Sequence, residues 1–471
     1  MADTIYDVAI IGSGPAGYTA AIRAGQLGLS TALIEKDPYL GGTCLHVGCI
    51  PTKSLLFNAE VYDHVKDGDA LGIENITAPK LNWGTIQKRK QGIVDKHAMG
   101  LQFLMKKNKV TVIQGYGKLT GTAQGGIHTV EVEGKSGKSA VKAKNVILST
   151  GSVARVLPGL TPDDRILTNI EVLSLNDIPK SLIVIGSGAV GVEFASIYKS
   201  FGTDVTILEM LPRYVPVEDE EISKELMRVY RKRGINGFVN AKVEKVERAK
   251  DGVAVTFTVD GKQQKIEADK VLIAVGRAPR TENVGIEKTK IEVDRGFVKT
   301  DQFMRTAEPG VYAIGDIAAG YPQLAHAGAM EGIVAVTHIA GKPAKPINKN
   351  RIPNATYCHP EIGSVGLTEA KAKEAGYNVK VGKFPFTANS RASIVGQHEG
   401  FVKIVTDAKY GEVLGVHIIG PTATELIAES VVALELECTA EHLANIIHAH
   451  PTLSEAMLDA SNAVFGMPIN T

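Results

Sequence analysis

Two cysteines near the N-terminus could carry redox chemistry. Cys44 and Cys49 lie in the segment GGTCLHVGCIPTK, with four residues between them. On an ideal helix, residues at this spacing lie ~8–9 Å apart at Cα, whereas a disulfide needs a Cα separation of ~4.4–6.8 Å. Either the pair stays reduced, or the backbone is distorted between Leu45 and Gly48. Gly48 itself and Pro51 would make such a distortion feasible.

Two other interpretations of these thiols are a chance pair of buried cysteines and half of a metal site. Zinc ligands usually come as two closely spaced Cys or His pairs. Cys358 and Cys438 are isolated in the sequence, so we expect them to be small core residues rather than ligands. The pattern favours a redox-active pair and predicts no metal site.

Two segments of the chain share a pattern that is typical of phosphate binding. Residues 7–36 and 181–210 each contain an apolar run, a G-x-G-x-x-G motif, a helical pattern and a second apolar run. The first glycine permits a tight turn, the second a close approach to a pyrophosphate, and the third close helix–strand packing. Two complete copies therefore predict two dinucleotide sites, with these motif glycines: Gly12, Gly14, Gly17, Gly186, Gly188 and Gly191.

Each copy also has a carboxylate at the same distance from its first glycine. These residues are Glu35 and Glu209, and each follows the second apolar run. A carboxylate at this position can accept hydrogen bonds from ribose hydroxyls, and it would repel a 2'-phosphate. Glu209 therefore favours NAD over NADP at the second site, with a small opposing effect from nearby Arg213.

A histidine and a glutamate near the C-terminus are candidates for acid–base chemistry. The segment is HAHPTLSE, which places His450 five residues before Glu455. Thiol–disulfide exchange needs a base because only the thiolate attacks, and a carboxylate can orient a histidine for that task. Two other interpretations stay open: His448 and His450 could be a metal pair, and Thr452 with Glu455 could form only a helix capping box. We expect His448 to be structural.

The chain is long enough for several domains, and its balance of charges is neutral. It has 471 residues, with 52 Lys and Arg against 51 Asp and Glu. This balance gives no broad basic field, so nucleic acid or an anionic membrane is not an expected partner. There is no apolar stretch of transmembrane length, no signal-peptide pattern at the start and no disulfide framework. We therefore expect a cytoplasmic protein.

The elements that position these residues are those of an α/β protein. The sequence predicts a helix over 86–108, strands and hairpins over 109–119, 129–150 and 253–275, a buried strand over 311–316, a linker over 341–351, strands near 354–366, 401–405 and 412–419, and helices near 421–446. The prediction is two Rossmann-like dinucleotide-binding domains, followed by a C-terminal α+β domain suited to dimerisation.

The cysteine segment resembles the active-site loop of the flavin-dependent pyridine nucleotide–disulfide oxidoreductases. The resemblance covers nearly the whole chain, including both glycine motifs, the turn at Thr150 and Gly151, and the strand end VYAIGD. It implies FAD at the first site and NAD at the second. It also implies four domains: an FAD-binding part over 1–150, an NAD-binding domain over 151–280, a central domain over 281–348 and an interface domain over 349–471.

The same resemblance implies roles for individual residues. Cys44 would be the sulfur that exchanges with substrate, Cys49 would lie beside the flavin, and the two would form a disulfide. His450 and Glu455 would act on the cysteines of the other subunit of a homodimer. The implied cofactor contacts beyond the glycine motifs and their acids are Lys53, Thr150, Gly151, Glu193, Gly276, Asp316 and His326, with Lys53 and Glu193 paired near flavin and nicotinamide.

The sequence departs from the family pattern at three places. His46 replaces a common Asn, Cys358 stands where Thr is frequent, and QLAHAGAMEG lacks the usual charges after LAH. None of these departures removes a catalytic group.

Two further segments indicate a substrate. PFTANSRA and HAHPTLSE resemble members that oxidise protein-bound dihydrolipoyl groups with NAD+. The expected partner is then a lipoyl-bearing acyltransferase or carrier protein of a 2-oxo acid dehydrogenase complex or glycine cleavage system. One alternative is an NAD(P)H-dependent reductase of another disulfide, similar to glutathione reductase. Another alternative is a non-catalytic docking subunit. Such a subunit should lack one of the four catalytic groups, and this chain has all of them: Cys44, Cys49, His450 and Glu455.

Overall fold

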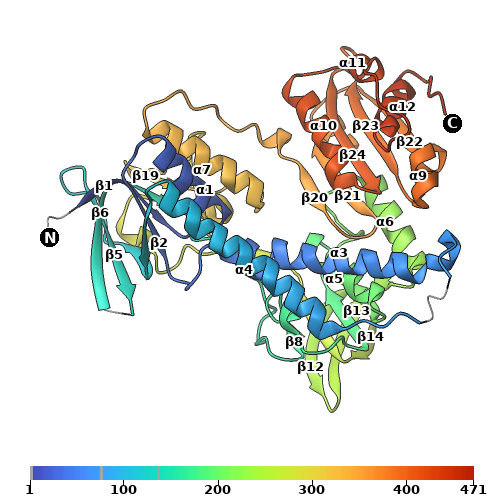
Figure 1. The fold of residues 1–471 in the computed structure, drawn as a ribbon, viewed down its shortest axis with the longest axis horizontal. Helices are drawn as coiled ribbons and strands as arrows, with labels where there is room; N and C mark the ends of the chain where they lie inside the picture. Colours follow the sequence, from blue (N-terminus) through green and yellow to red (C-terminus); the bar gives the residue numbers. More distant parts are fainter. Residues whose placement is uncertain (1–3, 75–77, 136, 471) are drawn as a thin grey trace. The chain divides into compact units, whose positions relative to one another are not determined.

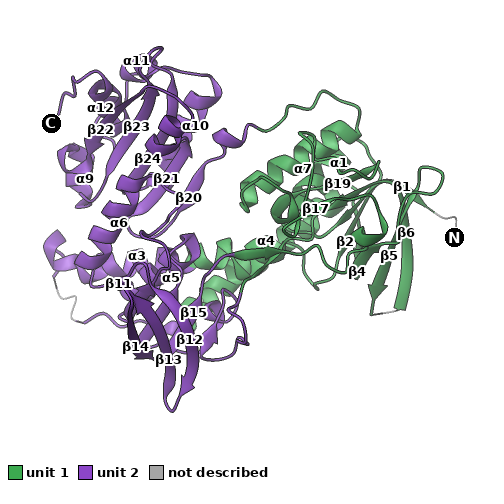
Figure 2. Cartoon of the chain, turned by 180° about the vertical axis from the view of Figure 1, so that it is seen from behind, with its two compact units in different colours: residues 1–54, 84–155, 277–347 green, residues 55–83, 156–276, 348–471 purple. Residues whose placement is uncertain are grey.

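The computed structural model describes residues 4–74, 78–135 and 137–470. The chain divides into two compact units (Figure 2). Unit 1 comprises residues 1–54, 84–155 and 277–347, and unit 2 comprises 55–83, 156–276 and 348–471. The chain thus crosses between the units several times, and the four-domain division stays a prediction.

Unit 1 is built on a mixed sheet with the strand order β3-β2-β1-β6-β5-β4, and β19 pairs with β6. The strands are β1 (Ile5–Ile11), β2 (Thr31–Glu35), β3 (Thr111–Gln114), β4 (Tyr116–Leu119), β5 (His128–Gly134), β6 (Gly137–Leu148) and β19 (Val311–Ala313). β1 lies parallel to both β2 and β6. Its last four residues are buried, as expected for a parallel strand covered on both faces.

The helices of unit 1 include α1 (Pro15–Gln26) and α7 (Ala325–Ile339), which pack against each other. A Cβ on Gly332 would lie 2.8 Å from the carbonyl oxygen of Ala16, so this contact requires glycine. α2 (Gly42–Val47) and the first turns of α3 (Cys49–Lys66) carry the cysteine segment, and α3 belongs to unit 2 from Leu55 on. α4 (Trp83–Lys107) confirms the helix predicted over 86–108. Two short pairs complete the unit: β7 (Ser152–Ala154) with β16 (Arg277–Pro279), and β17 (Val293–Asp294) with β18 (Phe297–Val298).

Unit 2 contains a fully parallel sheet, with the order β11-β10-β9-β15-β8. Its strands are β8 (Ile166–Leu167), β9 (Ser181–Ile185), β10 (Asp204–Leu208), β11 (Asn236–Phe238) and β15 (Lys270–Ile273). α5 (Ala189–Ser200) packs on β9 and β10, and α6 (Glu220–Lys232) leads into β11. An antiparallel sheet follows, formed by β12 (Lys242–Ala249), β13 (Gly252–Val259) and β14 (Lys262–Ala268). Both dinucleotide folds of the sequence prediction are therefore present.

The C-terminal part of unit 2 is an antiparallel sheet with helices against it (Figure 1). Its order is β20-β21-β24-β23-β22, formed by β20 (Asn354–Thr356), β21 (Glu361–Gly366), β22 (Val379–Pro385), β23 (Phe401–Asp407) and β24 (Val413–Gly420). α10 (Ala423–Glu435) packs on β21 and β24, and α12 (Glu455–Val464) packs on β22 and β23. The remaining helices are α8 (Glu369–Glu374), α9 (Ser390–Val395) and α11 (Ala440–Ala444). This part confirms the predicted α+β domain.

Short 3-10 helices connect several elements, at Gly68–Leu71, Val172–Ser174, Ile286–Lys288, Gly315–Ile317, Lys349–Arg351 and Phe386–Ala388. Among the helices of the described residues, none is long and apolar enough to cross a lipid bilayer.

The packing of α12 on β22 predicts an effect on stability. A Cβ on Gly382 would lie 2.0 Å from the carbonyl oxygen of Ala460, so Gly382→Ala should push α12 away from the sheet. Overpacking of this kind costs ~1–3 kcal/mol, and thermal unfolding should show a lower midpoint. The control is Gly92→Ala on the exposed side of α4, where a Cβ meets nothing within 4 Å. Equal midpoints for the two variants would contradict this account of the packing.

Candidate active site

The two cysteines of the N-terminal segment come together because a helix is interrupted. α2 ends at Val47 and α3 begins at Cys49, so only Gly48 separates them. A Cβ on Gly48 would lie 2.8 Å from the Thr43 carbonyl oxygen and 3.1 Å from the Cα of Cys44. The chain can approach itself this closely only with glycine. Of the two alternatives for this spacing, a reduced pair or a distorted backbone, the structure shows a break in the helix at Gly48 together with two free thiols.

The thiols of Cys44 and Cys49 are partly buried and lie within hydrogen-bonding contact, without a bond between them. The hydrogen bond with Cys49 and, next, burial raise the pKa of the Cys44 thiol, while the charge of Lys53 lowers it. Because the two thiols are coupled, a second thiolate is disfavoured once one has formed. The pair can therefore exchange with a disulfide one sulfur at a time. Formation of a Cys44–Cys49 disulfide stays a prediction.

The first glycine motif forms a narrow turn before α1. A Cβ on Gly12 would lie 2.2 Å from the Ser149 carbonyl oxygen, and one on Gly17 would lie 1.9 Å from that of Gly12. Gly14 is the N-cap of α1 and faces open space, with no side-chain cap and Pro15 at the start of the helix. The free N–H groups at this helix end are suited to bind a phosphate.

The second motif repeats this geometry in unit 2. A Cβ on Gly186 would lie 2.4 Å from the Ala274 carbonyl oxygen, and one on Gly191 would lie 1.9 Å from that of Gly186. Gly188 is the N-cap of α5, has no side-chain cap and faces open space. The similarity between the two segments in sequence is thus a similarity in backbone geometry.

The acids that follow the two motifs are held in matching ways. The Oε2 atom of Glu35 accepts from the Ser13 N–H at 2.8 Å and from the Ser13 hydroxyl at 2.6 Å. The Oε2 atom of Glu209 accepts from the Ser187 N–H and from its hydroxyl, both at 2.7 Å. In each acid, Oε1 accepts one backbone N–H, that of Asp37 or of Leu211. One lone pair on Oε1 remains for a ribose hydroxyl.

Both sites therefore fit a dinucleotide. Each combines a helix end with free N–H groups, open space in front of the middle glycine and a fixed carboxylate. Sequence reasoning did not assign a role to Ser13 and Ser187, although the repeated G-S-G was the available signal. Across the described ranges, no group of three His, Cys, Asp or Glu side chains is arranged to hold a metal ion.

Asp316 is fixed by a network that sequence reasoning missed. The Ser152 hydroxyl donates to Asp316 and accepts from the Nε of Arg277 at 2.7 Å. The buried carboxylate of Glu331 accepts from the Gly315 N–H at 2.6 Å, one residue before Asp316. Arg277 belongs to the segment AVGRAPR, which directly follows β15 and was the available signal.

Other predicted cofactor contacts lie at turns or helix ends. Gly151 has a φ of +74°, and its carbonyl oxygen accepts from the Arg280 N–H at 2.8 Å. The Thr150 hydroxyl donates to the Arg280 carbonyl oxygen. Gly276 has a φ of +103° just before β16, and His326 is the second residue of α7.

His450 and Glu455 form a hydrogen-bonded pair at the start of α12, whose first residue is Glu455. The Nδ1 of His450 lies 2.9 Å from the Oε1 of Glu455, while the His450 side chain is 70% exposed. The Oε2 of Glu455 accepts from the Thr452 N–H at 2.8 Å. The predicted capping box is not formed, because Ser454 is the N-cap of α12 without a side-chain bond, and the Thr452 hydroxyl donates to the Ala449 carbonyl oxygen. Burial raises the pKa of Glu455, but the bonds from Thr452 and His450 together lower it, so the carboxylate is ionised at neutral pH.

His448 has a different environment. Its side chain is 5% exposed, and its Nε2 lies 3.0 Å from the Oε1 of Glu429 on α10. This contact holds His448 inside unit 2, in keeping with a structural role.

The predicted residues divide between the two units. Unit 1 contains the cysteines, Lys53, Asp316 and the first glycine motif, and unit 2 contains the second motif, Glu193, His450 and Glu455. Glu193 is buried on α5, and its carboxylate accepts from the Tyr357 N–H at 2.9 Å. The pairing of Lys53 with Glu193 stays a prediction.

Comparison with known families finds two matches along the chain. Residues 6–332 match the pyridine nucleotide-disulphide oxidoreductases, and residues 352–461 match the dimerisation domain of the same family.

Individual relatives match over nearly their full lengths. A dihydrolipoyl dehydrogenase from Rhizobium etli is 45% identical over 99% of both chains, and one from Bacillus subtilis is 43% identical over 99% of both. The structure is similar to that of LpdA from Mycobacterium tuberculosis, with a TM-score of 0.89 and 30% identity over 97% of this chain and 98% of the other. It is also similar to RclA, a flavoprotein disulfide reductase from Escherichia coli, with a TM-score of 0.85 and 27% identity over 97% and 99% of the chains.

The interruption at Gly48 predicts how the thiols respond to substitution. Gly48→Ala should move Cys44 away from Cys49, and a displacement of ~1 Å can weaken a proximity effect about 100-fold. After mild reduction, titration with a trivalent arsenical, which bridges two adjacent thiols, should show a corresponding loss of affinity. Gly100→Ala on α4, where a Cβ meets nothing within 4 Å, should leave the affinity unchanged. Wild-type affinity in Gly48→Ala would refute the role of this glycine.

Proposed function

The chain belongs to the pyridine nucleotide-disulphide oxidoreductases, and we propose on that basis that it oxidises protein-bound dihydrolipoyl groups with NAD+ as the final acceptor. Dihydrolipoyl dehydrogenases are 43–45% identical to it over nearly their whole lengths. The structural observation that carries the proposal is the contact between Cys44 and Cys49 at the interruption of the helix. Two adjacent cysteines that can form a disulfide are what a dithiol substrate needs in order to leave as a cyclic disulfide.

The cysteines perform the exchange in two displacements. A substrate thiolate attacks Cys44 in the oxidised pair, a mixed disulfide forms, and Cys49 leaves as a thiolate. The second substrate thiol then displaces Cys44, so the substrate leaves as a cyclic disulfide and the enzyme holds two thiols. The substrate loses two electrons and two protons, and the cysteine pair gains the electrons.

The chain's own residues hold the two cofactors of the family, FAD and NAD. Gly12, Gly14, Gly17 and Glu35 would hold FAD together with Asp316 in unit 1, and the second motif with Glu209 would hold NAD in unit 2. When bound, they supply the two-electron acceptors that restore the cysteine disulfide. Ser152, Arg277 and Glu331 fix the position of Asp316, so this acid is already oriented for a hydroxyl donor.

His450 is the proposed base for the substrate thiols. Its Nδ1 is directed to Glu455, which fixes the ring, and its exposed side chain leaves Nε2 open to accept a proton. The chain carries the family's dimerisation domain over 352–461, which contains His450. We propose that His450 and Glu455 serve the cysteines of the second subunit in a homodimer.

The partner proposed is a lipoyl-bearing acyltransferase or carrier protein of a 2-oxo acid dehydrogenase complex or glycine cleavage system. The names of the relatives support a lipoyl substrate, but they do not select one complex. We also propose a cytoplasmic location, in keeping with four cysteines in 471 residues and no disulfide framework.

A second candidate function is the NAD(P)H-dependent reduction of another disulfide. The similarity to RclA, a flavoprotein disulfide reductase, supports it. The fixed carboxylate of Glu209 favours NAD over NADP. Parallel assays with lipoamide and glutathione disulfide, each with both nucleotides, separate the two functions.

Substitution of either active-site cysteine should abolish turnover. Cys44→Ser or Cys49→Ser should reduce dihydrolipoamide oxidation by more than about 1000-fold, because a hydroxyl cannot replace the thiolate in exchange. The yellow flavin absorbance should persist in both, since the FAD residues are elsewhere in unit 1. Cys438→Ser is the control and should stay active. Undiminished turnover in Cys44→Ser or Cys49→Ser would end the proposal.

A hybrid dimer tests whether His450 acts across the dimer. Cys49→Ser and His450→Gln should each be nearly inactive alone. When the two are refolded together in equal amounts, about half of the dimers are mixed, and each has one complete site only if histidine and cysteines come from different subunits. The mixture should then recover about a quarter of wild-type activity. No recovery, with mixed dimers verified by two affinity tags, would place the pair in one subunit.

A further inference from the structure

A row of polar residues crosses the C-terminal sheet of unit 2. Lys403 on β23 is paired with Lys383 on β22 and with His417 on β24, which is paired in turn with Ser364 on β21. Residues opposite one another on adjacent strands face the same side of a sheet. Lys403, His417 and Ser364 are 2%, 1% and 3% exposed. Every residue of β23 and β24 is buried, so a cation in this position needs compensation.

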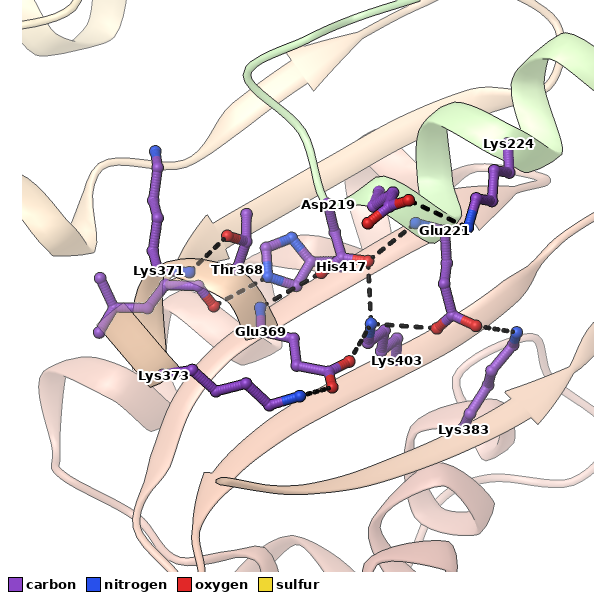
Figure 3. Close-up of polar contacts among 12 residues, drawn as sticks. Asp219, Glu221, Lys224, Thr368, Glu369, Lys371, Lys373, Lys383, Lys403 and His417 are labelled. Atoms are coloured by element: carbon purple, nitrogen blue, oxygen red, sulfur yellow. Dashed lines mark hydrogen bonds and ion pairs between the residues drawn. The ribbon is translucent and has the colours of Figure 1, made fainter. Parts of the chain in front are cut away.

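Three carboxylates compensate the charge of Lys403 (Figure 3). Its Nζ lies 2.9 Å from Asp219, 3.0 Å from Glu221 and 2.8 Å from Glu369. Burial lowers the pKa of Lys403, but the bonds to the three acids outweigh it and raise the pKa well above its usual value. Lys403 therefore stays charged, and its loss would leave three carboxylates close together without their shared cation.

The carboxylates connect Lys403 to the beginning of α6. Asp219 is the N-cap of α6, and its Oδ1 accepts from the Glu221 N–H at 3.1 Å. Its Oδ2 accepts from the Glu369 N–H at 3.2 Å, which joins the starts of α6 and α8. Lys403 thus neutralises the residue that fixes the first turn of α6.

The segment over 209–219 joins this cluster to the second dinucleotide site. At its first residue, Glu209 accepts from the N–H and hydroxyl of Ser187, inside the second glycine motif. Midway, the Val215 N–H donates to the Ser187 carbonyl oxygen at 3.0 Å. At its last residue, Asp219 is bonded to Lys403. The segment is held at the nucleotide site and at the sheet.

We propose that Lys403 is a positioning residue for the NAD site: by binding Asp219, Glu221 and Glu369 together, it fixes the α6 end of the segment 209–219 and thereby the position of Glu209. The identity of the nucleotide rests on the proposed function. All of these contacts lie in unit 2, whereas the cysteines lie in unit 1. The loss of Lys403 should weaken nucleotide binding without changing thiol exchange.

The test uses the FAD-loaded wild-type protein and Lys403→Met, with NADH binding measured by equilibrium dialysis. The dissociation constant should rise on the order of tenfold in the variant, a typical size for an effect transmitted through packed neighbours. The KM for NAD+ should rise similarly, while the KM for dihydrolipoamide and kcat at saturating NAD+ stay within about twofold. A Lys403→Arg variant keeps the charge and should bind NADH nearly as well as the wild type.

Lys383→Met is the matched control, because Lys383 is 42% exposed and bonds Glu221 from outside the cluster. It should leave NADH binding unchanged. If Lys403→Met does not fold, Asp219→Asn replaces it, since asparagine still caps a helix but has no charge for Lys403. Unchanged NADH binding in the folded variant, or equal losses for NAD+ and dihydrolipoamide, would overturn the proposal in favour of a purely structural cluster.

NADH binding also separates this inference from the proposed function. A wild-type protein that binds NADH but does not oxidise dihydrolipoamide would refute the substrate, while weaker binding in the variant would still support the role of Lys403.

Discussion

The close approach of the chain to itself at Gly48 is the constraint on which the proposed chemistry depends. An unbroken helix would hold Cys44 and Cys49 too far apart for any bond between their sulfurs. The break between α2 and α3 brings the thiols into contact, and the absence of a side chain at Gly48 makes room for the carbonyl of Thr43. In its disulfide form, this pair can take two electrons from a dithiol.

Close contact between backbone segments also shapes both dinucleotide sites. In each one, the first and third glycines lie so near a carbonyl oxygen that a Cβ would overlap it, while the middle glycine faces open space. The acids Glu35 and Glu209 complete the two sites, and a serine inside each motif holds the acid through two hydrogen bonds. A helix end suited to bind a phosphate and a carboxylate suited to bind a ribose are therefore held in place in advance, so little ordering would be required when a nucleotide binds.

In unit 2, the buried charge of Lys403 holds a chain segment in position. In the C-terminal sheet, the buried residues Lys403, His417 and Ser364 form a row beside a largely apolar core, and Lys403 contacts Asp219 and Glu221 at the start of α6. An ion cluster of this kind stabilises little compared with apolar packing, but it tolerates few alternative arrangements. It therefore serves to specify where the nucleotide-binding segment lies on the sheet, rather than simply to strengthen the contact.

The sequence alone determined the features that depend on local pattern. The two G-x-G-x-x-G units, their acids and the α/β class follow from residue types at fixed spacing, because the turns and helix ends they form are local. For Cys44 and Cys49, the spacing alone left open a reduced pair or a distorted backbone. Only the tertiary structure revealed how Ser152 and Arg277 fix Asp316, and how Lys403 meets Asp219, Glu221 and Glu369. These partners lie more than a hundred residues apart or on separate elements. A side chain's charge is visible in a sequence. Its partners and its low-dielectric surroundings exist only after the chain has folded.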